Sequence, residues 1–191
     1  AFVRASKATA VKFVYFARMY NRDLGYNVLL PELHAHGLSE GDAIQMGWKD
    51  ADEVLEWIEI ARDIFHNDNY PDKMIVHGIS MGAATTMNVS GKVVPDYVNA
   101  FIEDCGYTSV WDEFSMQLKE LFGLPSFPLM NCTNLLCRMK YGWDFAEASP
   151  LNSVARCEKP MLLIHGDDDT FVPTSMLQPL YDAKPEPKQM Y

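Results

Sequence analysis

Residues 74–84 read MIVHGISMGAA, and this stretch decides the fold. The apolar run at 73–77 predicts a buried strand, and the small residues that follow predict a helix that ends at Gly91. Ser80 stands between the two elements in the pattern Gly-x-Ser-x-Gly. A tight strand-to-helix turn leaves no room for side chains at the two glycines, and it lifts the serine hydroxyl above the sheet.

The rest of the sequence repeats this alternation of strand and helix. Further strands are predicted at Tyr26–Leu30, Val98–Asp104, Met161–His165 and Lys188–Tyr191. Helices are predicted over Val54–Phe65, with Asp50 and Glu53 at its start, and from Pro173 to Tyr181. Apolar strands that alternate with helices predict an α/β fold, a mostly parallel sheet flanked by helices on both faces. Polar loops then collect at the carboxyl ends of the strands, where such sheets bind ligands.

A helical segment at 108–139 interrupts the alternation. It is rich in aromatic residues and methionine, and we expect it to form a small lid-like insertion over the ligand-binding edge. Periodicity alone equally allows an additional pair of core helices. The length of 191 residues, with 48% hydrophobic residues, otherwise fits a single domain over 1–191 that is incomplete at both ends.

The net charge of −10 and the four cysteines narrow the function classes. Negative charge repels phosphate backbones, so nucleic acid is not an expected partner. Because their spacing is unlike that of metal-binding knuckles, we interpret Cys105, Cys132, Cys137 and Cys157 as thiols, with a Cys132–Cys137 disulfide as the alternative. Because no run of about 18 apolar residues occurs, the default expectation is a cytoplasmic protein, with tethering to the cell envelope by a preceding segment as the alternative. The sequence leaves the oligomeric state open.

Ser80 is the candidate nucleophile. A serine hydroxyl is a weak nucleophile at neutral pH, so it needs a base, an exposed position and donors for the oxyanion that it creates. The sharp turn supplies the exposed position. The backbone N–H of Met81, at the positive end of the following helix, is the candidate oxyanion donor.

Two other polar stretches accompany predicted strands. Residues 165–173 read HGDDDTFVP directly after an apolar strand, and their three aspartates alone also fit a solvated turn or a cation site. Residues 30–39 read LPELHAHGLS, in which His34 and His36 have a metal-like spacing. A metal ion needs three or four converging ligands, and no further partner for these histidines is evident. We therefore predict no metal site.

In their order along the chain, residues 30–39, 74–84 and 165–173 resemble the motifs of the α/β-hydrolase superfamily. The resemblance is closest to its bacterial serine-aminopeptidase-like and prolyl-oligopeptidase-like hydrolases. It implies Ser80 as the nucleophile and, from the pattern G-x-x-D-x-x-V-P, Asp169 as the acid of a catalytic triad. Asp104, which follows another predicted strand, is the alternative acid, because some lipases of this fold use that position.

The resemblance also implies a reaction. It is the hydrolysis of an ester, thioester or amide through an acyl-enzyme on Ser80, without a metal or an organic cofactor. The aromatic segment 108–139 favours a small-molecule substrate with a hydrophobic acyl group. Residues 30–39 are similar to the pattern D-x-R-G-H-G-x-S, although they depart from it at Glu32 and His34, and they imply a scaffold near the oxyanion hole.

Two parts of the superfamily pattern are missing from the sequence. A strand that ends in His-Gly should lie between a strand at 1–10 and a helix at 13–21, where there is no space for it, so we expect a break in the chain between Ala8 and Val14. The triad histidine should follow Asp169, and that role is filled by none of His34, His36, His66, His77 and His165. A continuous backbone would instead favour the alternative function, a non-catalytic binding protein of this fold that lacks a complete triad.

Overall fold

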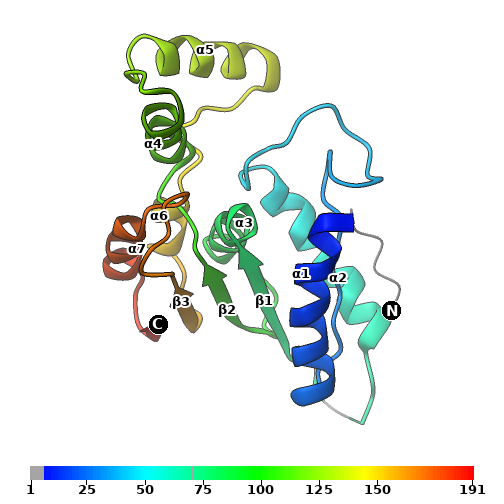
Figure 1. The fold of residues 1–191 in the computed structure, drawn as a ribbon. Coiled ribbons are helices and arrows are strands. Elements are labelled where there is room, and N and C mark those ends of the chain that lie inside the picture. The colour runs from blue at the N-terminus through cyan, green and yellow to red at the C-terminus, as the bar shows by residue number, and fades with distance from the viewer. Residues whose placement is uncertain (1–6, 70) are drawn as a thin grey trace. The chain divides into compact units, whose positions relative to one another are not determined.

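The chain folds into two compact units. The structure is a computed structural model that describes residues 7–69 and 71–191 (Figure 1). One unit comprises Ala1–Gln45 with Asp52–Asp72, and the other comprises Met46–Ala51 with Lys73–Tyr191. The single domain expected over 1–191 stays a prediction.

The second unit is built on a parallel sheet. Among the described residues its strands are β1 (Met74–Ile79), β2 (Val98–Asp104), β3 (Met161–Ile164) and β4 (Lys188–Met190), in the order β1-β2-β3-β4 (Figure 1). Ile79 pairs with Asp104, and Asp104 pairs with Ile164. The first three strands therefore end at one edge of the sheet.

Helices of the same unit pack against this sheet. α3 (Met81–Ser90) packs against β1 and β2, α6 (Pro150–Val154) packs against α3, and α7 (Leu177–Ala183) follows the short helix η2 (Thr174–Met176) and packs against α6 and β3. Small side chains let α3 approach the strands closely, and every residue from Ala83 to Ser90 is buried. The predicted α/β fold with a parallel sheet is confirmed.

Two helices occupy the segment that interrupts the alternation. They are α4 (Val110–Phe122) and α5 (Leu129–Tyr141). The Ser109 hydroxyl accepts the Asp112 N–H at the start of α4, and Gly123 follows its last turn in the left-handed region, with φ 64°. Local capping signals thus set both ends of α4.

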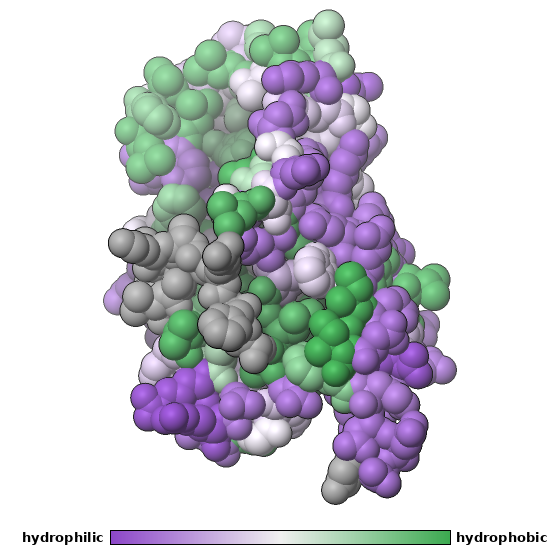
Figure 2. Space-filling view, turned by 90° about the vertical axis from the view of Figure 1, so that its right-hand side faces the viewer, coloured by the Kyte–Doolittle hydropathy of each residue, from purple (hydrophilic) through white to green (hydrophobic). Residues whose placement is uncertain are grey.

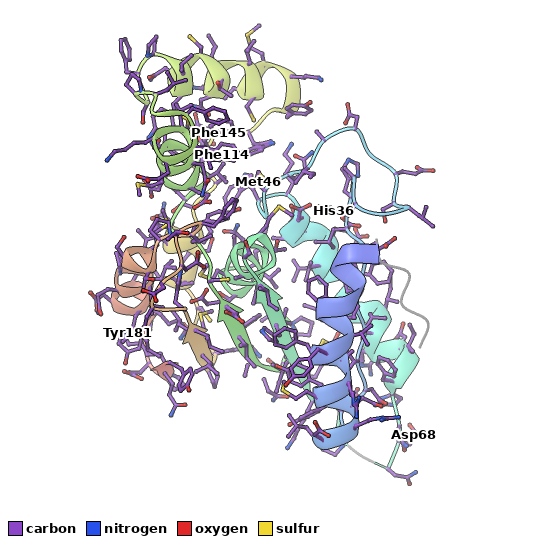
Figure 3. All side chains as sticks on the ribbon, in the orientation of Figure 1. His36, Met46, Asp68, Phe114, Phe145 and Tyr181 are labelled. Carbon is purple, nitrogen blue, oxygen red and sulfur yellow. The ribbon has the colours of Figure 1, made fainter. Side chains whose placement is uncertain are left out.

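The inner faces of α4 and α5 belong to a hydrophobic core. Its buried members include Tyr107, Val110, Met130, Cys137, Trp143 and Phe145. Phe114 packs against this cluster, and its ring meets Phe145 edge to face with the ring centroids 5.2 Å apart (Figure 3). The two helices therefore contribute to a core, and their role as a lid stays a prediction.

The outer faces of these helices carry exposed apolar side chains. Hydrophobic side chains gather at the top of the view in Figure 2, where α5 lies. More than half of the residue's surface is exposed at Leu121 and Phe122 of α4, at Leu136 and Met139 of α5, and at Phe127 between the two helices. On α5, the buried Met130 and Cys137 point away from the exposed Leu136 and Met139. α5 therefore has apolar residues on two opposite faces.

The first unit is mainly helical where the structure describes it. α1 (Lys7–Arg18) continues into a π-helical turn, η1 (Met19–Asp23), and most of α2 (Asp50–Phe65) belongs to this unit. α2 confirms the helix predicted at Val54–Phe65. The Glu53 carboxylate near its start accepts the His34 N–H at 2.9 Å.

Two predictions for the start of the chain are wrong. Residues 7–10 are helical and form no strand, while residues 1–6 of that predicted strand lie outside the described ones. α1 covers residues 8–14 without interruption, and the expected break between Ala8 and Val14 stays a prediction. Tyr26–Leu30 forms no strand either. Its backbone N–H and C=O groups have no ladder partner in the described part of the chain, and a strand exists only when such groups pair.

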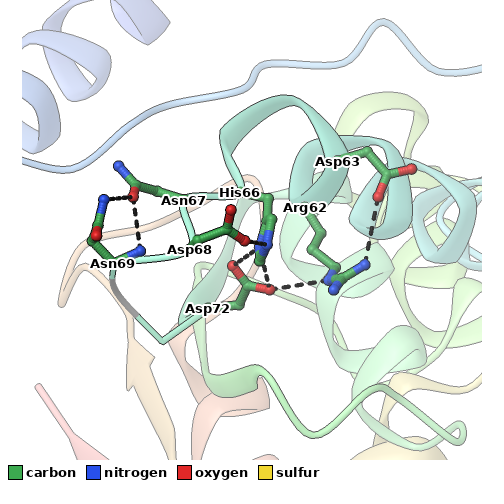
Figure 4. A network of polar contacts seen from close by, with 7 residues as sticks. All are labelled: Arg62, Asp63, His66, Asn67, Asp68, Asn69 and Asp72. Atoms are coloured by element: carbon green, nitrogen blue, oxygen red, sulfur yellow. Dashed lines mark hydrogen bonds and ion pairs between the residues drawn. The ribbon is translucent and has the colours of Figure 1, made fainter.

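A polar network stabilises the loop after α2 (Figure 4). The His66 ring lies 2.9 Å from Asp72 and 3.1 Å from Asp68, and Arg62 Nε donates to Asp72 at 3.0 Å. The hydrogen bonds to Asp72 and Asp68 raise the pKa of His66, and the bond to His66 lowers the pKa of Asp72. The network ties the last turn of α2 to the residues that follow it.

Three other properties concern membranes, thiols and metals. Within residues 7–69 and 71–191, no helix combines the length and apolar character that crossing a bilayer requires. All four cysteines are free thiols, and on α5 Cys132 is exposed while Cys137 is buried. No group of three His, Cys, Asp or Glu side chains in that part of the chain could hold a metal ion.

Candidate active site

Ser80 has the backbone of a sharp strand-to-helix turn. It lies between β1 and α3 with φ 57° and ψ −118°, outside the regions that residues with side chains normally adopt. Such strain persists only where the surrounding structure enforces it. The expectation that Ser80 lies in a sparsely populated backbone region is confirmed. Met81 is the first residue of α3, where a backbone N–H has no acceptor within the helix.

Gly78 lies tightly against the start of α3. A Cβ atom at Gly78 would lie 1.9 Å from the Gly82 carbonyl oxygen, so the first turn of α3 packs directly onto the end of β1. Gly82 differs, because a Cβ atom there would meet no described atom within 4 Å. The expectation that both glycines leave no room for a side chain is right for Gly78 and wrong for Gly82.

The two glycines form a matched pair for a stability test. Gly78→Ala should lower the free energy of unfolding by about 3 kcal/mol or more, because the new methyl group overlaps a backbone carbonyl that cannot move alone. Gly82→Ala should instead be neutral or raise it by up to about 1 kcal/mol, since alanine favours the helix over glycine. Urea unfolding followed by circular dichroism measures both changes. Equal destabilisation by the two variants would contradict this account of the turn.

Backbone hydrogen bonds fix Ser80 to the carboxyl edge of the sheet. The Ser80 N–H donates to the Asp104 carbonyl at 2.8 Å, and the Cys105 N–H donates to the Ile164 carbonyl at 2.8 Å. Because β1, β2 and β3 are parallel and end level with one another, Asp104 and the loop that carries Asp169 lie at the same edge as Ser80. Room for an imidazole between Ser80 and Asp169 stays a prediction.

The loop after β3 holds Asp169 by one of its two carboxylate oxygens. Asp169 Oδ1 accepts the N–H groups of Phe171, at 2.9 Å, and Val172, at 3.0 Å. Oδ2 lies 3.9 Å from His165 Nε2, which lies 2.9 Å from the Val172 carbonyl oxygen. The two N–H groups that donate to Oδ1 fix the orientation of the carboxylate, and therefore the direction in which Oδ2 points. An acid that orients an imidazole needs such a fixed oxygen.

The histidines occupy other positions. His165 is buried and bonded to Val172, and His77 lies within β1, where burial lowers its pKa. The scaffold positions expected for these two residues agree with the structure. His34, His36 and His66 belong to the first unit. His36 contacts the His34 carbonyl oxygen, His66 contacts Asp68 and Asp72, and His165 contacts the Val172 carbonyl oxygen, so these contacts do not involve Ser80.

Cys105 is the other nucleophilic side chain near Ser80. Its backbone also lies in the left-handed region, with φ 52°. Burial and then the charge of Asp104 raise the pKa of Cys105 to about 11. A thiol that stays protonated is a poor nucleophile, so Ser80 is the better candidate at this edge.

Glu32 organises the loop at residues 30–39, which belongs to the first unit. Its Oε2 accepts the Leu38 N–H at 3.1 Å, and its backbone carbonyl accepts the Ser39 hydroxyl at 2.7 Å. Glu32 is one of the two positions at which the loop departs from the superfamily pattern, and there it serves as an internal brace. The expected place of this loop near the oxyanion hole stays a prediction.

Two buried carboxyl groups at this edge were not identified from the sequence. Glu103 on β2 is fully buried, and its Oε2 accepts the Gly106 N–H at 3.0 Å. Glu113 lies in the first turn of α4. Burial raises the pKa of Glu103 to about 8 and that of Glu113 to about 7. The sequence signal that could have identified Glu103 is the alternation of side chains along β2, which puts Glu103 on the same face as the buried Phe101.

Glu103 should make the stability of the chain depend on pH. Its folded-state pKa, about 8, exceeds the ordinary value of 4.5, so the folded chain keeps a proton that the unfolded chain releases. Stability should therefore fall as the pH rises from about 4.5 to 8, by at most about 5 kcal/mol from this group. Glu103→Gln should flatten that fall in urea titrations at pH 5 and pH 8.5. The exposed Glu120→Gln serves as the control, and an unchanged slope in Glu103→Gln would refute the assignment.

Known proteins resemble this chain in sequence and in fold. The uncharacterized protein YqkD of Bacillus subtilis is 31% identical over 169 residues, which cover 88% of this chain and 54% of that protein. The Pyrococcus furiosus esterase Pf2001 matches 97% of this chain and 68% of its own, with a TM-score of 0.69 and 21% identity. The Pyrococcus horikoshii acylaminoacyl peptidase matches 77% of this chain and 23% of its own, with a TM-score of 0.54 and 20% identity. No protein-family model matches the chain.

These structural neighbours have the α/β-hydrolase fold, and so does this chain. The resemblance identified from Ser80, Asp169 and the residues around them is therefore confirmed at the level of the fold. The chain spans about half the length of the curated relatives that it matches.

Proposed function

We propose that the protein containing this α/β-hydrolase chain is a serine hydrolase. The Ser80 hydroxyl attacks an acyl carbonyl while an imidazole accepts its proton, and the Met81 N–H stabilises the oxyanion. Asp169 orients the imidazole and stabilises its positive charge. The imidazole then returns the proton to the leaving group, and water releases the acid from the acyl-enzyme.

The observation that carries this proposal is the backbone of Ser80. A residue held at φ 57° and ψ −118° costs about 1–3 kcal/mol, and a glycine would relieve much of it. A catalytic role for the hydroxyl would explain why a serine, rather than a glycine, occupies this strained position. The neighbouring N–H of Met81 and the loop of Asp169 at the same edge offer an oxyanion donor and an acid for acyl transfer.

The base of the triad is proposed to come from another part of the protein. In this fold the histidine follows the acid in the chain, after Asp169. The curated relatives are about twice as long as the matched region. Their additional residues are long enough to include a histidine in this role. The proposal thus concerns the whole protein rather than this chain alone.

Carboxylic esters with hydrophobic acyl groups are the proposed substrates. One structural neighbour is named as an esterase and another as an acylaminoacyl peptidase, so both ester and amide hydrolysis belong in the comparison. The apolar helices α4 and α5 favour an apolar acyl group. Across p-nitrophenyl esters of increasing chain length, kcat/KM should rise and should exceed that for aminoacyl anilides. No cofactor is proposed.

A non-catalytic binding protein is the second candidate. The helical structure of Lys7–Asp23 favours it, because the strand that would end in His-Gly does not lie within these residues. Such a protein would keep Gly78 for the fold and would bind its ligand without forming a covalent bond to Ser80.

Covalent labelling separates the two candidates. A fluorophosphonate reacts with an activated serine, so the full-length protein should be labelled at one site. Peptide mass spectrometry should find the adduct on Ser80, and labelling should vanish in Ser80→Ala. If the folded full-length protein takes up no label, the hydrolase is excluded and the binding protein is supported.

A further inference from the structure

We propose that Gln117 on α4 is a positioning residue for Asp169, which it orients through the peptide group between Phe171 and Val172. The inference rests on the proposed function, in which Asp169 orients the catalytic imidazole. It gives α4 a part in the chemistry that is separate from its predicted role as a lid.

A single peptide group joins Gln117 to Asp169. The Gln117 side-chain amide donates to the Phe171 carbonyl oxygen. The N–H of the same peptide group belongs to Val172, and it donates to Asp169 Oδ1 at 3.0 Å. A peptide group is planar, and its C=O and N–H point in opposite directions. The direction of the Gln117 bond is therefore passed to the Asp169 carboxylate, and the linked hydrogen bonds polarise one another.

Glu113 orients the Gln117 amide. It lies one turn earlier on α4, only 3% of its surface is exposed, and its Oε1 accepts from Gln117 Nε2 at 3.2 Å. The amide nitrogen has two hydrogens, one for Glu113 and one for Phe171. Turning the amide over would bring its oxygen against two acceptors, so only one orientation keeps both bonds.

The loop of Asp169 is thus held from two elements. At the end of β3, His165 Nε2 lies 2.9 Å from the Val172 carbonyl oxygen. On the other side, Gln117 of α4 holds the preceding carbonyl, that of Phe171. Without Gln117, the Phe171–Val172 peptide group is free to tilt, and Asp169 Oδ1 loses one of the two donors that fix it.

Gln117→Met tests the proposal because it removes the donor and keeps the length of the side chain. Gln178→Met is the matched control, since Gln178 makes the same one-turn contact, to Asp182 at 2.8 Å, on the exposed surface of α7. Glu113→Gln keeps an oxygen that can accept from Gln117, whereas Glu113→Leu does not. The full-length protein is measured for kcat and KM on a p-nitrophenyl ester and for hydrogen exchange at the Val172 amide.

In Gln117→Met we expect kcat to fall about ten-fold to a hundred-fold at nearly constant KM, since a misplaced acid weakens the chemical step more than binding. Exchange at Val172 should become about ten-fold faster, because a lost hydrogen bond of ~1.4 kcal/mol changes an opening equilibrium by that factor. Glu113→Leu should reproduce both effects, Glu113→Gln should restore most of the activity, and Gln178→Met should change neither quantity.

Unchanged exchange at Val172 in Gln117→Met overturns the proposal, whether or not the protein is active. An equal fall of kcat in Gln178→Met also overturns it, because the effect would then be general. Failure of the proposed function gives a different result. In that case the wild-type protein takes up no fluorophosphonate and turns over no ester, while faster exchange in Gln117→Met still supports the link between α4 and Asp169.

Discussion

Replacing Ser80 with alanine is expected to lower kcat for ester hydrolysis by roughly 10⁶-fold, the scale seen when a triad serine is removed. The reason is that the neighbouring thiol of Cys105 is a poor replacement for the hydroxyl. Cys105, the nearest thiol, has a pKa of about 11 and is protonated at neutral pH. The measurement is the hydrolysis of a p-nitrophenyl ester by the full-length protein at saturating substrate.

The controls for this experiment come from the same helix. Alanine has a Cβ atom as serine does, so Ser80→Ala should keep the backbone strain and the stability of the wild type. Ser90→Ala, at the far end of α3, removes a buried hydroxyl that donates to the Met87 carbonyl at 2.8 Å, and it should leave kcat unchanged. Ser80→Gly should raise stability by about 1 kcal/mol, because glycine tolerates φ 57°, and should be inactive. Full activity in Ser80→Ala would end the proposal of a serine nucleophile.

Replacing Asp169 with asparagine should lower kcat about 10⁴-fold, as the same change does to a triad aspartate elsewhere. The surrounding hydrogen bonds explain why. Oδ1 accepts two backbone N–H groups, so an asparagine must put its oxygen there and its NH2 group at the position of Oδ2. That NH2 group would face the imidazole N–H that the carboxylate oxygen is proposed to accept. The imidazole would then be held in the wrong tautomer.

Asp104→Asn is the comparison that decides between the two candidate acids. Asp104 lies at the same edge of the sheet, and its backbone carbonyl already accepts the Ser80 N–H at 2.8 Å. If Asp169 is the acid, Asp104→Asn should lower kcat by less than about ten-fold, since its backbone contact survives. A 10⁴-fold loss in Asp104→Asn with an active Asp169→Asn would transfer the role to Asp104.

The elements around Ser80 were predictable because each has a local signal. The sequence predicts β2 at Val98–Asp104, and the structure has it at the same residues. An apolar run between polar loops, followed by a helix of small residues, also predicts β1 and α3 and the strained turn between them. Parallel strands in register then bring Asp104 and Asp169 to one edge without further information.

Other features could not be predicted because they depend on contacts that are remote in sequence. Tyr26–Leu30 has the composition of a strand, but an apolar run becomes a strand only when another strand pairs with it. The contact between Gln117 and Phe171 joins residues 54 positions apart, so neither helical periodicity nor a motif marks it. The space around Gly82 could not be predicted either, because it depends on which residues pack near this position.

The steric difference between Gly78 and Ser80 separates ancestry from activity. Gly78 is required by the packing of α3 on β1, whatever the protein does, whereas the hydroxyl of Ser80 matters to the chemistry that we propose. A lineage that stopped hydrolysing its substrate would be free to replace Ser80 but would still carry a glycine at position 78. Among descendants of such a gene, the glycine would record common origin, and the serine would record continued selection for the proposed catalysis.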